Sequence, residues 1–170
     1  MAEYLKSGWS VPRSEDFDLK DFALGVLEIA KENLQRDGEL VSMAFIITQD
    51  QLQCLSISFA DHEEKPAAYR ELVKAALDAK ASALITCNDA YWSAKAGSDD
   101  VEGYYPGKLA AEGAQECIML TVSGPGIQSW CVDVPYVRSG KKIEFSEPSE
   151  SFGEAIGFLE GWAQEGSRVQ

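Results

Sequence analysis

The amino-acid sequence predicts an α+β fold, in which one domain contains a mainly antiparallel sheet of about five or six strands packed by about three helices. Apolar residues follow helical and strand periods in the order α-β-β-α-β-(insert)-β-β-β-α. Short turns join neighbouring strands as hairpins, and no β-α-β unit repeats regularly. The length of 170 residues is that of one domain.

The first helix is predicted from about Asp18 to Arg36, because its apolar residues recur every three or four positions. Asp16 or Asp18 can cap the start of this helix, and Gly38 supplies its stop.

Residues 1–15 are expected to form an N-terminal arm, which leaves residues 16–170 as the domain. Trp9 and Val11 are expected to hold this arm against the body of the protein, because an exposed tryptophan is rare without a partner.

Two strands follow the first helix, at Leu40–Thr48 and Gln51–Phe59, and a tight Gln49-Asp50 junction makes them a hairpin. The first is apolar on both faces, which is typical of a central strand. The second alternates apolar residues with Ser56 and Ser58, which predicts a half-buried strand.

Pro66 is well placed as the first residue of a second helix, which is expected to end near Lys80. The short apolar run Ala83–Cys87 predicts a third strand. A polar and acidic insert at residues 88–115 then interrupts the regular pattern.

A second hairpin is predicted after the insert, from Glu116–Ser123 and Ile127–Val134 around a Gly-Pro-Gly turn. Pro135 is expected to end the second of these strands, and a short strand at Lys142–Phe145 follows.

A last helix is predicted from the capping box formed by Ser151 and Glu154, followed by an apolar stripe. The complete element order resembles that of roadblock-like and profilin-like scaffold domains. The resemblance is one of element order alone, so it implies an architecture and no function or residue roles.

The formal net charge is −13, from 15 Lys and Arg against 28 Asp and Glu. Such a surface repels phosphate groups, so nucleic-acid binding and attachment to anionic membranes are not expected. We see neither a signal peptide nor a membrane span. The four cysteines form no C-x-x-C pair, which favours reduced, buried thiols and a cytoplasmic location over disulfides or a zinc site.

Large aromatic residues within an acidic insert favour a ligand wall or a partner-binding patch. An alternative is that these side chains fold back over the sheet. Acidic neighbours favour a cationic or polyol ligand over a phosphate-bearing one. The candidate binding residues are Tyr91, Trp92, Tyr104, Tyr105 and Asp89.

A second candidate site uses His62 and Cys87 as a nucleophilic dyad between the Asp61–Glu64 segment and the start of the insert. The alternative for His62 is a place in an acidic helix N-terminus, and the alternative for Cys87 is a buried, inert thiol. Signatures of zinc deaminases, nucleotide-binding loops and serine hydrolases are absent, so we assign no catalytic residues, metal ligands or cofactor.

The leading functional hypothesis is therefore a non-catalytic binding or scaffold protein that forms a homodimer, because a hairpin-rich sheet has edges that self-association can cover. A small enzyme with its site at His62 and Cys87 is the alternative. A third possibility is an accessory protein that docks an acidic face on a basic partner.

Overall fold

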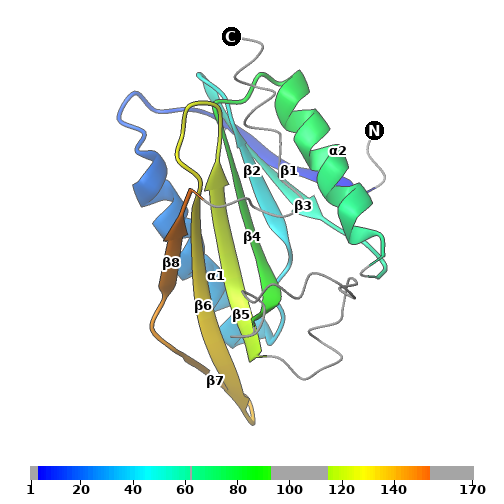
Figure 1. Ribbon diagram of the computed structural model, residues 1–170, viewed down its shortest axis with the longest axis vertical. Helices are drawn as coiled ribbons and strands as arrows, with labels where there is room; N and C mark the ends of the chain where they lie inside the picture. Colours follow the sequence, from blue (N-terminus) through cyan, green and yellow to red (C-terminus); the bar gives the residue numbers. More distant parts are fainter. Residues whose placement is uncertain (1–3, 62, 93–114, 154–170) are drawn as a thin grey trace.

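The computed structural model describes residues 4–61, 63–92 and 115–153. These residues form one antiparallel eight-stranded sheet and two helices, so the predicted α+β class is confirmed (Figure 1). The strand order is β1-β3-β2-β4-β5-β6-β7, and β8 also pairs with β6. The elements are β1 (Leu5–Pro12), α1 (Leu19–Asp37), β2 (Met43–Ile47), β3 (Gln51–Ile57), α2 (Lys65–Asp78), β4 (Ala83–Trp92), β5 (Gln115–Ser123), β6 (Trp130–Ser139), β7 (Lys142–Phe145) and β8 (Ser149–Phe152).

The expected count of about three helices and five or six strands is wrong for the described residues. Ser151 and Phe152, which the capping-box pattern assigned to the start of a third helix, lie in β8 and pair with Cys131 and Trp130. The remainder of that expected helix lies outside the described residues.

Helix α1 begins and ends as the sequence predicts. The Asp18 side chain accepts a hydrogen bond from the Asp21 backbone at 2.8 Å, which satisfies one free N–H of the first turn. Gly38 adopts a left-handed conformation with φ of 76° and donates its N–H to the Leu34 carbonyl. Neither described helix is long and apolar enough to cross a membrane.

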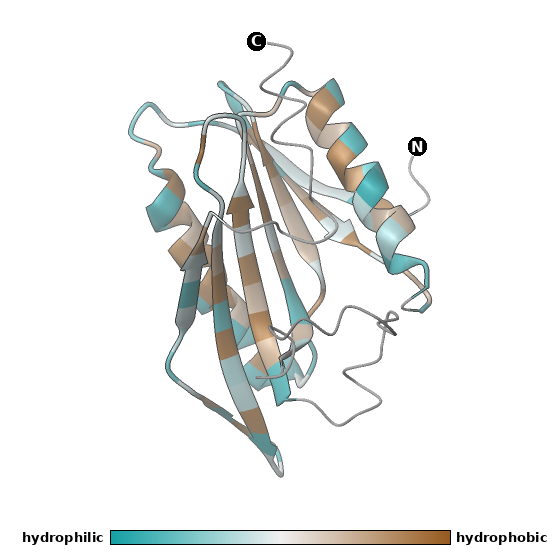
Figure 2. Cartoon of the chain, viewed as in Figure 1, coloured by the Kyte–Doolittle hydropathy of each residue, from teal (hydrophilic) through white to brown (hydrophobic). Residues whose placement is uncertain are grey.

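The two helices cover opposite faces of the sheet. Helix α1 packs its buried stripe against the larger core, which includes side chains from β2 to β7. Helix α2 packs against a smaller core formed with β1, β2 and β3 and one residue of β4 (Figure 1). Hydrophobic and hydrophilic residues alternate along β5 and β6, as expected for strands whose two faces differ (Figure 2).

The face of the sheet that carries α2 changes character between β2 and β4. Leu55 and Ala44 are paired across β3 and β2 and belong to the core under α2. The same row continues through Thr86, Thr121 and Cys131, so it is polar across β4 to β6. From β4 to β6 this face therefore carries polar side chains among apolar ones, whereas from β1 to β2 it belongs to the apolar core under α2.

Strand β4 is longer than predicted. The sequence ended this strand at Cys87, where polar residues begin, but β4 continues to Trp92. Its last residues pair with the start of β5, from Asn88 opposite Met119 to Trp92 opposite Gln115. The segment expected as an insert thus contributes strand residues at both of its ends.

Strand β6 also extends beyond its predicted end. Pro135 lies inside β6, at the point where the neighbouring strand changes from β8 to β7. The Pro135 carbonyl accepts a hydrogen bond from the Ser146 N–H at 2.8 Å. A proline, which has no N–H to donate, fits at such a break in the ladder.

Strand β1 occupies the segment that we expected to be an arm. It pairs with β3 along the edge of the described sheet and contains a β-bulge between Ser7 and Ser10. Gly8 lies in the bulge, where a Cβ atom would approach the Cys54 carbonyl oxygen to 3.0 Å.

Candidate functional site

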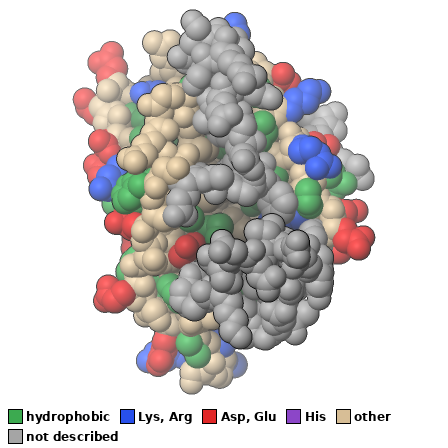
Figure 3. All heavy atoms as spheres, in the orientation of Figure 1, with side chains coloured by type: hydrophobic (Ala, Val, Ile, Leu, Met, Phe, Trp, Pro, Cys, Tyr) green, Lys and Arg blue, Asp and Glu red, His purple; other side chains and the backbone are tan. Residues whose placement is uncertain are grey.

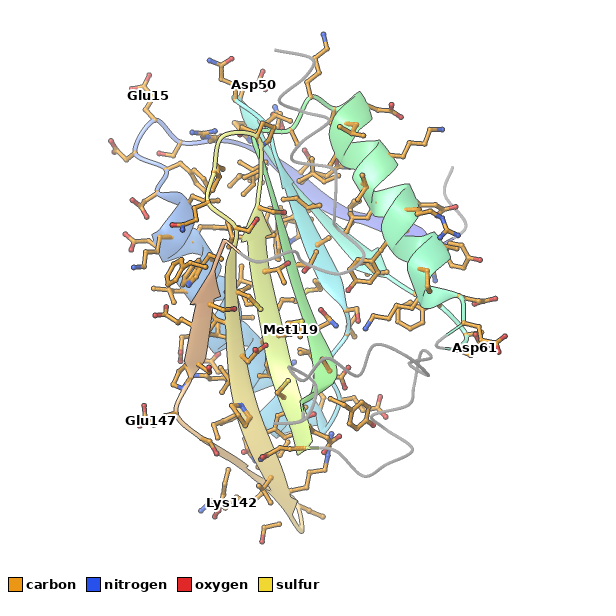
Figure 4. The ribbon with its side chains drawn as sticks, viewed as in Figure 1. Glu15, Asp50, Asp61, Met119, Lys142 and Glu147 are labelled. Atoms are coloured by element: carbon orange, nitrogen blue, oxygen red, sulfur yellow. The ribbon has the colours of Figure 1, made fainter. Side chains whose placement is uncertain are left out.

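The N-terminus of α2 and the C-terminal end of β4 lie at the same end of the sheet. In Figure 4, Asp61 marks this end, and Asp50 marks the opposite end. Cys87 pairs with Met43 at the beginning of β2, whereas Asp50 follows the end of β2. Residues after Cys87 on β4 therefore lie at the end of the molecule where α2 starts.

The acidic segment before α2 stabilises the beginning of this helix. The Asp61 carboxylate accepts hydrogen bonds from the N–H groups of Glu63 and Glu64 at 2.9 and 3.1 Å. The Glu64 carboxylate accepts a bond from the Ala60 N–H at 2.7 Å. These bonds close the turn that leads into α2, while Glu64 at the N-cap position makes no side-chain capping bond to the helix. His62 itself lies outside the described residues.

Cys87 is fully buried on the face of the sheet that α1 covers. Burial raises the pKa of the Cys87 thiol to about 12. A thiol that is protonated at neutral pH and shielded from solvent is a poor nucleophile. Cys87 is therefore placed as a packing residue of the core, like the other fully buried cysteine, Cys117.

A charged cluster lies just beyond Cys87, on the same side of the sheet as α1. Arg138 on β6 donates its Nε–H to the Glu116 carboxylate of β5 at 2.9 Å. The same guanidinium donates from Nη1 to the Gly38 carbonyl at 2.8 Å, which ties it to the end of α1. These two hydrogen bonds favour one orientation of the partly exposed Arg138 side chain.

Asp89 on β4 belongs to this cluster. Asp89 pairs with Ile118, two residues from Glu116, so the two carboxylates share a face of the sheet. Partial loss of hydration and the nearby Glu116 charge raise the pKa of Asp89, although Lys65 and Arg138 act in the opposite direction. Among the described residues Asp89 has no ion pair, so its charge is poorly compensated.

The Tyr136 side chain is buried beside Arg138. This side chain is 2% exposed, and its hydroxyl lies near the Arg138 guanidinium without a hydrogen bond of good geometry in the part of the chain described. The ring packs edge-on against Phe145, and the Arg138 guanidinium carbon lies 5.5 Å from the ring centre. Burial, with contributions from the Glu116 and Asp89 charges, raises the pKa of Tyr136 to about 12.

Lys65 lies in the first turn of α2, which covers the opposite face of the sheet from the charged cluster. Burial lowers the pKa of Lys65, while Asp89 raises it. The ammonium group lies 5.9 Å from the centre of the Tyr69 ring on the same helix. The charges of Lys65 and Asp89 therefore stabilise each other.

The aromatic candidates lie at different places in the chain. Tyr91 is on β4, opposite Glu116, and is 37% exposed. Trp92 ends β4, and its side chain is not among those described. Tyr104 and Tyr105 lie outside the described residues. The described part of the candidate site, here called the Asp89 cluster, comprises Asp89, Tyr91, Glu116, Tyr136 and Arg138.

Sequence patterns singled out Asp89 and Tyr91 as candidates, and they did not single out Glu116, Tyr136 and Arg138, which the structure places beside them. The three missed residues lie on strands whose pairing with β4 brings them close, and nothing local marks them. No group of three or more metal-ligating His, Cys, Asp or Glu side chains occurs in the described ranges.

Among the described residues, most of the acidic side chains visible on the face that carries α2 lie along its two margins (Figure 3).

The chain matches no protein-family model, and no curated protein or solved structure is significantly similar to it.

Proposed function

We propose that this chain is a non-catalytic binding or scaffold domain of the cytoplasm, which self-associates and binds a cationic nitrogen group at the Asp89 cluster. The group is an ammonium or a guanidinium, carried by a small amine or by a lysine or arginine side chain.

The observation that carries this proposal is the poorly compensated charge of Asp89. Asp89 is exposed at the end of β4, and the pKa of its carboxyl is raised by partial loss of hydration and by the Glu116 charge, so a bound cation would relieve the repulsion between the two carboxylates. Glu116 adds a second negative charge, which Arg138 partly neutralises.

Tyr91 suits the same ligand. Its exposed ring lies opposite Glu116, and aromatic faces attract ammonium and guanidinium groups. The Glu116 carboxylate and the Tyr91 ring lie opposite each other on neighbouring strands, so the two groups can hold one cation between them.

The catalytic alternative has less support. The Cys87 thiol is buried and has a raised pKa. The Asp61 carboxylate is engaged in backbone hydrogen bonds before α2, and His62 lies outside the described residues.

The binding experiment uses short capped peptides that differ at one central position, which is Lys, Arg, Gln or Glu. Isothermal titration calorimetry should detect binding of the Lys or Arg peptide and none of the Gln and Glu peptides. Free cadaverine and agmatine form a second arm, which separates recognition of a small amine from recognition of a side chain.

The Asp89→Asn variant should weaken binding by about tenfold or more, because a charge-assisted hydrogen bond is lost. Asp50→Asn is the matched control, since it removes a carboxylate at the opposite end of the sheet (Figure 4). Equal binding of the Gln and Lys peptides, or full binding by Asp89→Asn, contradicts the proposal.

A further inference from the structure

The bulge in β1 redirects the apolar side chains of this strand. Ser7 lies opposite Leu55, and Ser10 lies opposite Gln53, so three steps along β1 match two along β3. Side chains of a strand alternate between faces, and one extra residue moves every later side chain to the other face.

Leu5 and Trp9 consequently point to opposite faces. Leu5 is buried in the core under α2. Trp9 packs against Phe45 of the core under α1, with ring centres 6.0 Å apart. Val11 pairs with Leu52, which belongs to the same core as Phe45. Without the bulge, Leu5, Trp9 and Val11 would all lie on one face.

An apolar surface results at the edge of the sheet. Trp9 and Val11 remain 45% and 42% exposed. The half-buried Phe22 contacts Phe45 at 5.4 Å between ring centres, and Phe17 contacts Phe22 at 5.5 Å. We call Trp9, Val11, Phe17 and Phe22 the Trp9 surface.

The backbone edge of β1 is poorly suited to pairing with another strand. A bulge interrupts its hydrogen-bonding pattern, Pro12 lacks an N–H, and Lys6 places a charge on the strand. A partner at this edge therefore docks on the side chains of the Trp9 surface rather than extending the sheet.

The Trp9 surface is bordered by charges of both signs, so the surfaces of two copies can be complementary. Lys6 and Arg13 flank Trp9 and Val11 in the sequence, and the Arg13 guanidinium carbon lies 4.9 Å from the centre of the Phe17 ring. Exposed carboxylates of Glu15, Asp16 and Asp18 follow directly. In a two-fold contact, the cations of one copy can face the carboxylates of the other.

We propose that the Trp9 surface is the contact through which two copies of this chain associate. The inference rests on the self-association proposed above and names its surface. Apolar residues form the centre of the contact, and the charged residues form its rim, as is usual in interfaces.

Sedimentation velocity across a concentration series tests the inference. The wild-type chain should form a dimer, and Trp9→Ser should raise the dimer dissociation constant by about tenfold or more, since tryptophans often dominate such contacts. Val11→Thr, which keeps nearly the same shape, should weaken the dimer to a smaller extent. Lys6→Glu should also weaken it, by placing an acid among the partner's carboxylates.

Val41→Ser is the matched control, because Val41 is exposed before β2 at the end of the sheet away from Val11. It should dimerise like the wild type. Circular dichroism establishes that each variant is folded. If folded Trp9→Ser and Val11→Thr chains dimerise like the wild type, the Trp9 surface is not the dimer contact. If the wild-type chain stays monomeric, the proposal of self-association is itself wrong. Neither result changes the peptide titration at Asp89, because β3 and β2 separate β1 from β4.

Discussion

Thr86 and Thr121 form a hydrogen bond through their side-chain hydroxyls across the centre of the sheet. They are paired in the β4–β5 register and are 1% and 2% exposed. Each hydroxyl can donate and accept, so the pair satisfies two polar groups where water has little access. This bond lies on the part of the face that carries polar side chains among apolar ones, beside the apolar core under α2.

The first prediction concerns this pair. Thr86→Val or Thr121→Val alone should lower the free energy of unfolding by about 1–3 kcal/mol, because each leaves one buried hydroxyl without its partner. The double variant should lose less than the sum of the two, since it removes both polar groups together. Urea unfolding measures all four chains. Additive losses would show that the two hydroxyls do not depend on each other.

Replacing Gly124 or Gly25 by alanine should change the stability of the fold in opposite directions. A Cβ atom on Gly124 would clash with the Ser82 carbonyl oxygen, so Gly124→Ala should destabilise the fold by about 1–3 kcal/mol. Gly25 lies within α1, and a Cβ there meets nothing within 4 Å. Gly25→Ala should stabilise the fold by about 0.5–1 kcal/mol. Thermal unfolding of both variants checks the signs, and a stabilised Gly124→Ala would contradict the close packing of this turn.

Local signals in the sequence predicted the parts of the fold that local interactions determine. The Asp18 cap and the Gly38 stop placed α1 within about a residue, because both act through bonds inside the helix. The strand at Lys142–Phe145 has its predicted bounds. Both elements depend on neighbours in the chain.

Distant pairing decides the elements that the sequence placed wrongly. Asn88 and Asp89 look like the start of a loop, yet β5 supplies their strand partners. In β1, the bulge puts Trp9 out of phase with Leu5, so the alternation that marks a strand is absent from the sequence. The same reasoning explains why Arg138 was missed, since Glu116 reaches it only through the β5–β6 pairing.

Thiol reactivity should separate Cys131 from the other cysteines. Cys131 is partly exposed, while Cys54, Cys87 and Cys117 are buried and have raised pKa values. In the native protein, a thiol-reactive disulfide reagent should modify Cys131 first. The remaining thiols should react when urea unfolds the chain. Cys131→Ser should remove the fast phase, and a fast phase that persists in this variant would contradict the burial of the others.

The last prediction concerns Asp89 and pH. Its pKa is raised in the folded chain, so the fold favours the protonated form over the carboxylate. At neutral pH the ionised Asp89 therefore destabilises the fold relative to a neutral residue, and Asp89→Asn should be the more stable chain. The gain should stay below about 1 kcal/mol, because the side chain keeps contact with solvent.

This advantage should shrink as the pH falls through the raised pKa of Asp89 toward the unfolded value of about 3.9, because the wild-type chain then takes up its proton. Unfolding of both chains across this pH range measures the difference, with Asp50→Asn as the control. A wild type more stable than Asp89→Asn at neutral pH would mean that Lys65 and Arg138 outweigh the loss of hydration. The carboxylate would then be well compensated, and Asp89 would have no particular attraction for a cationic ligand.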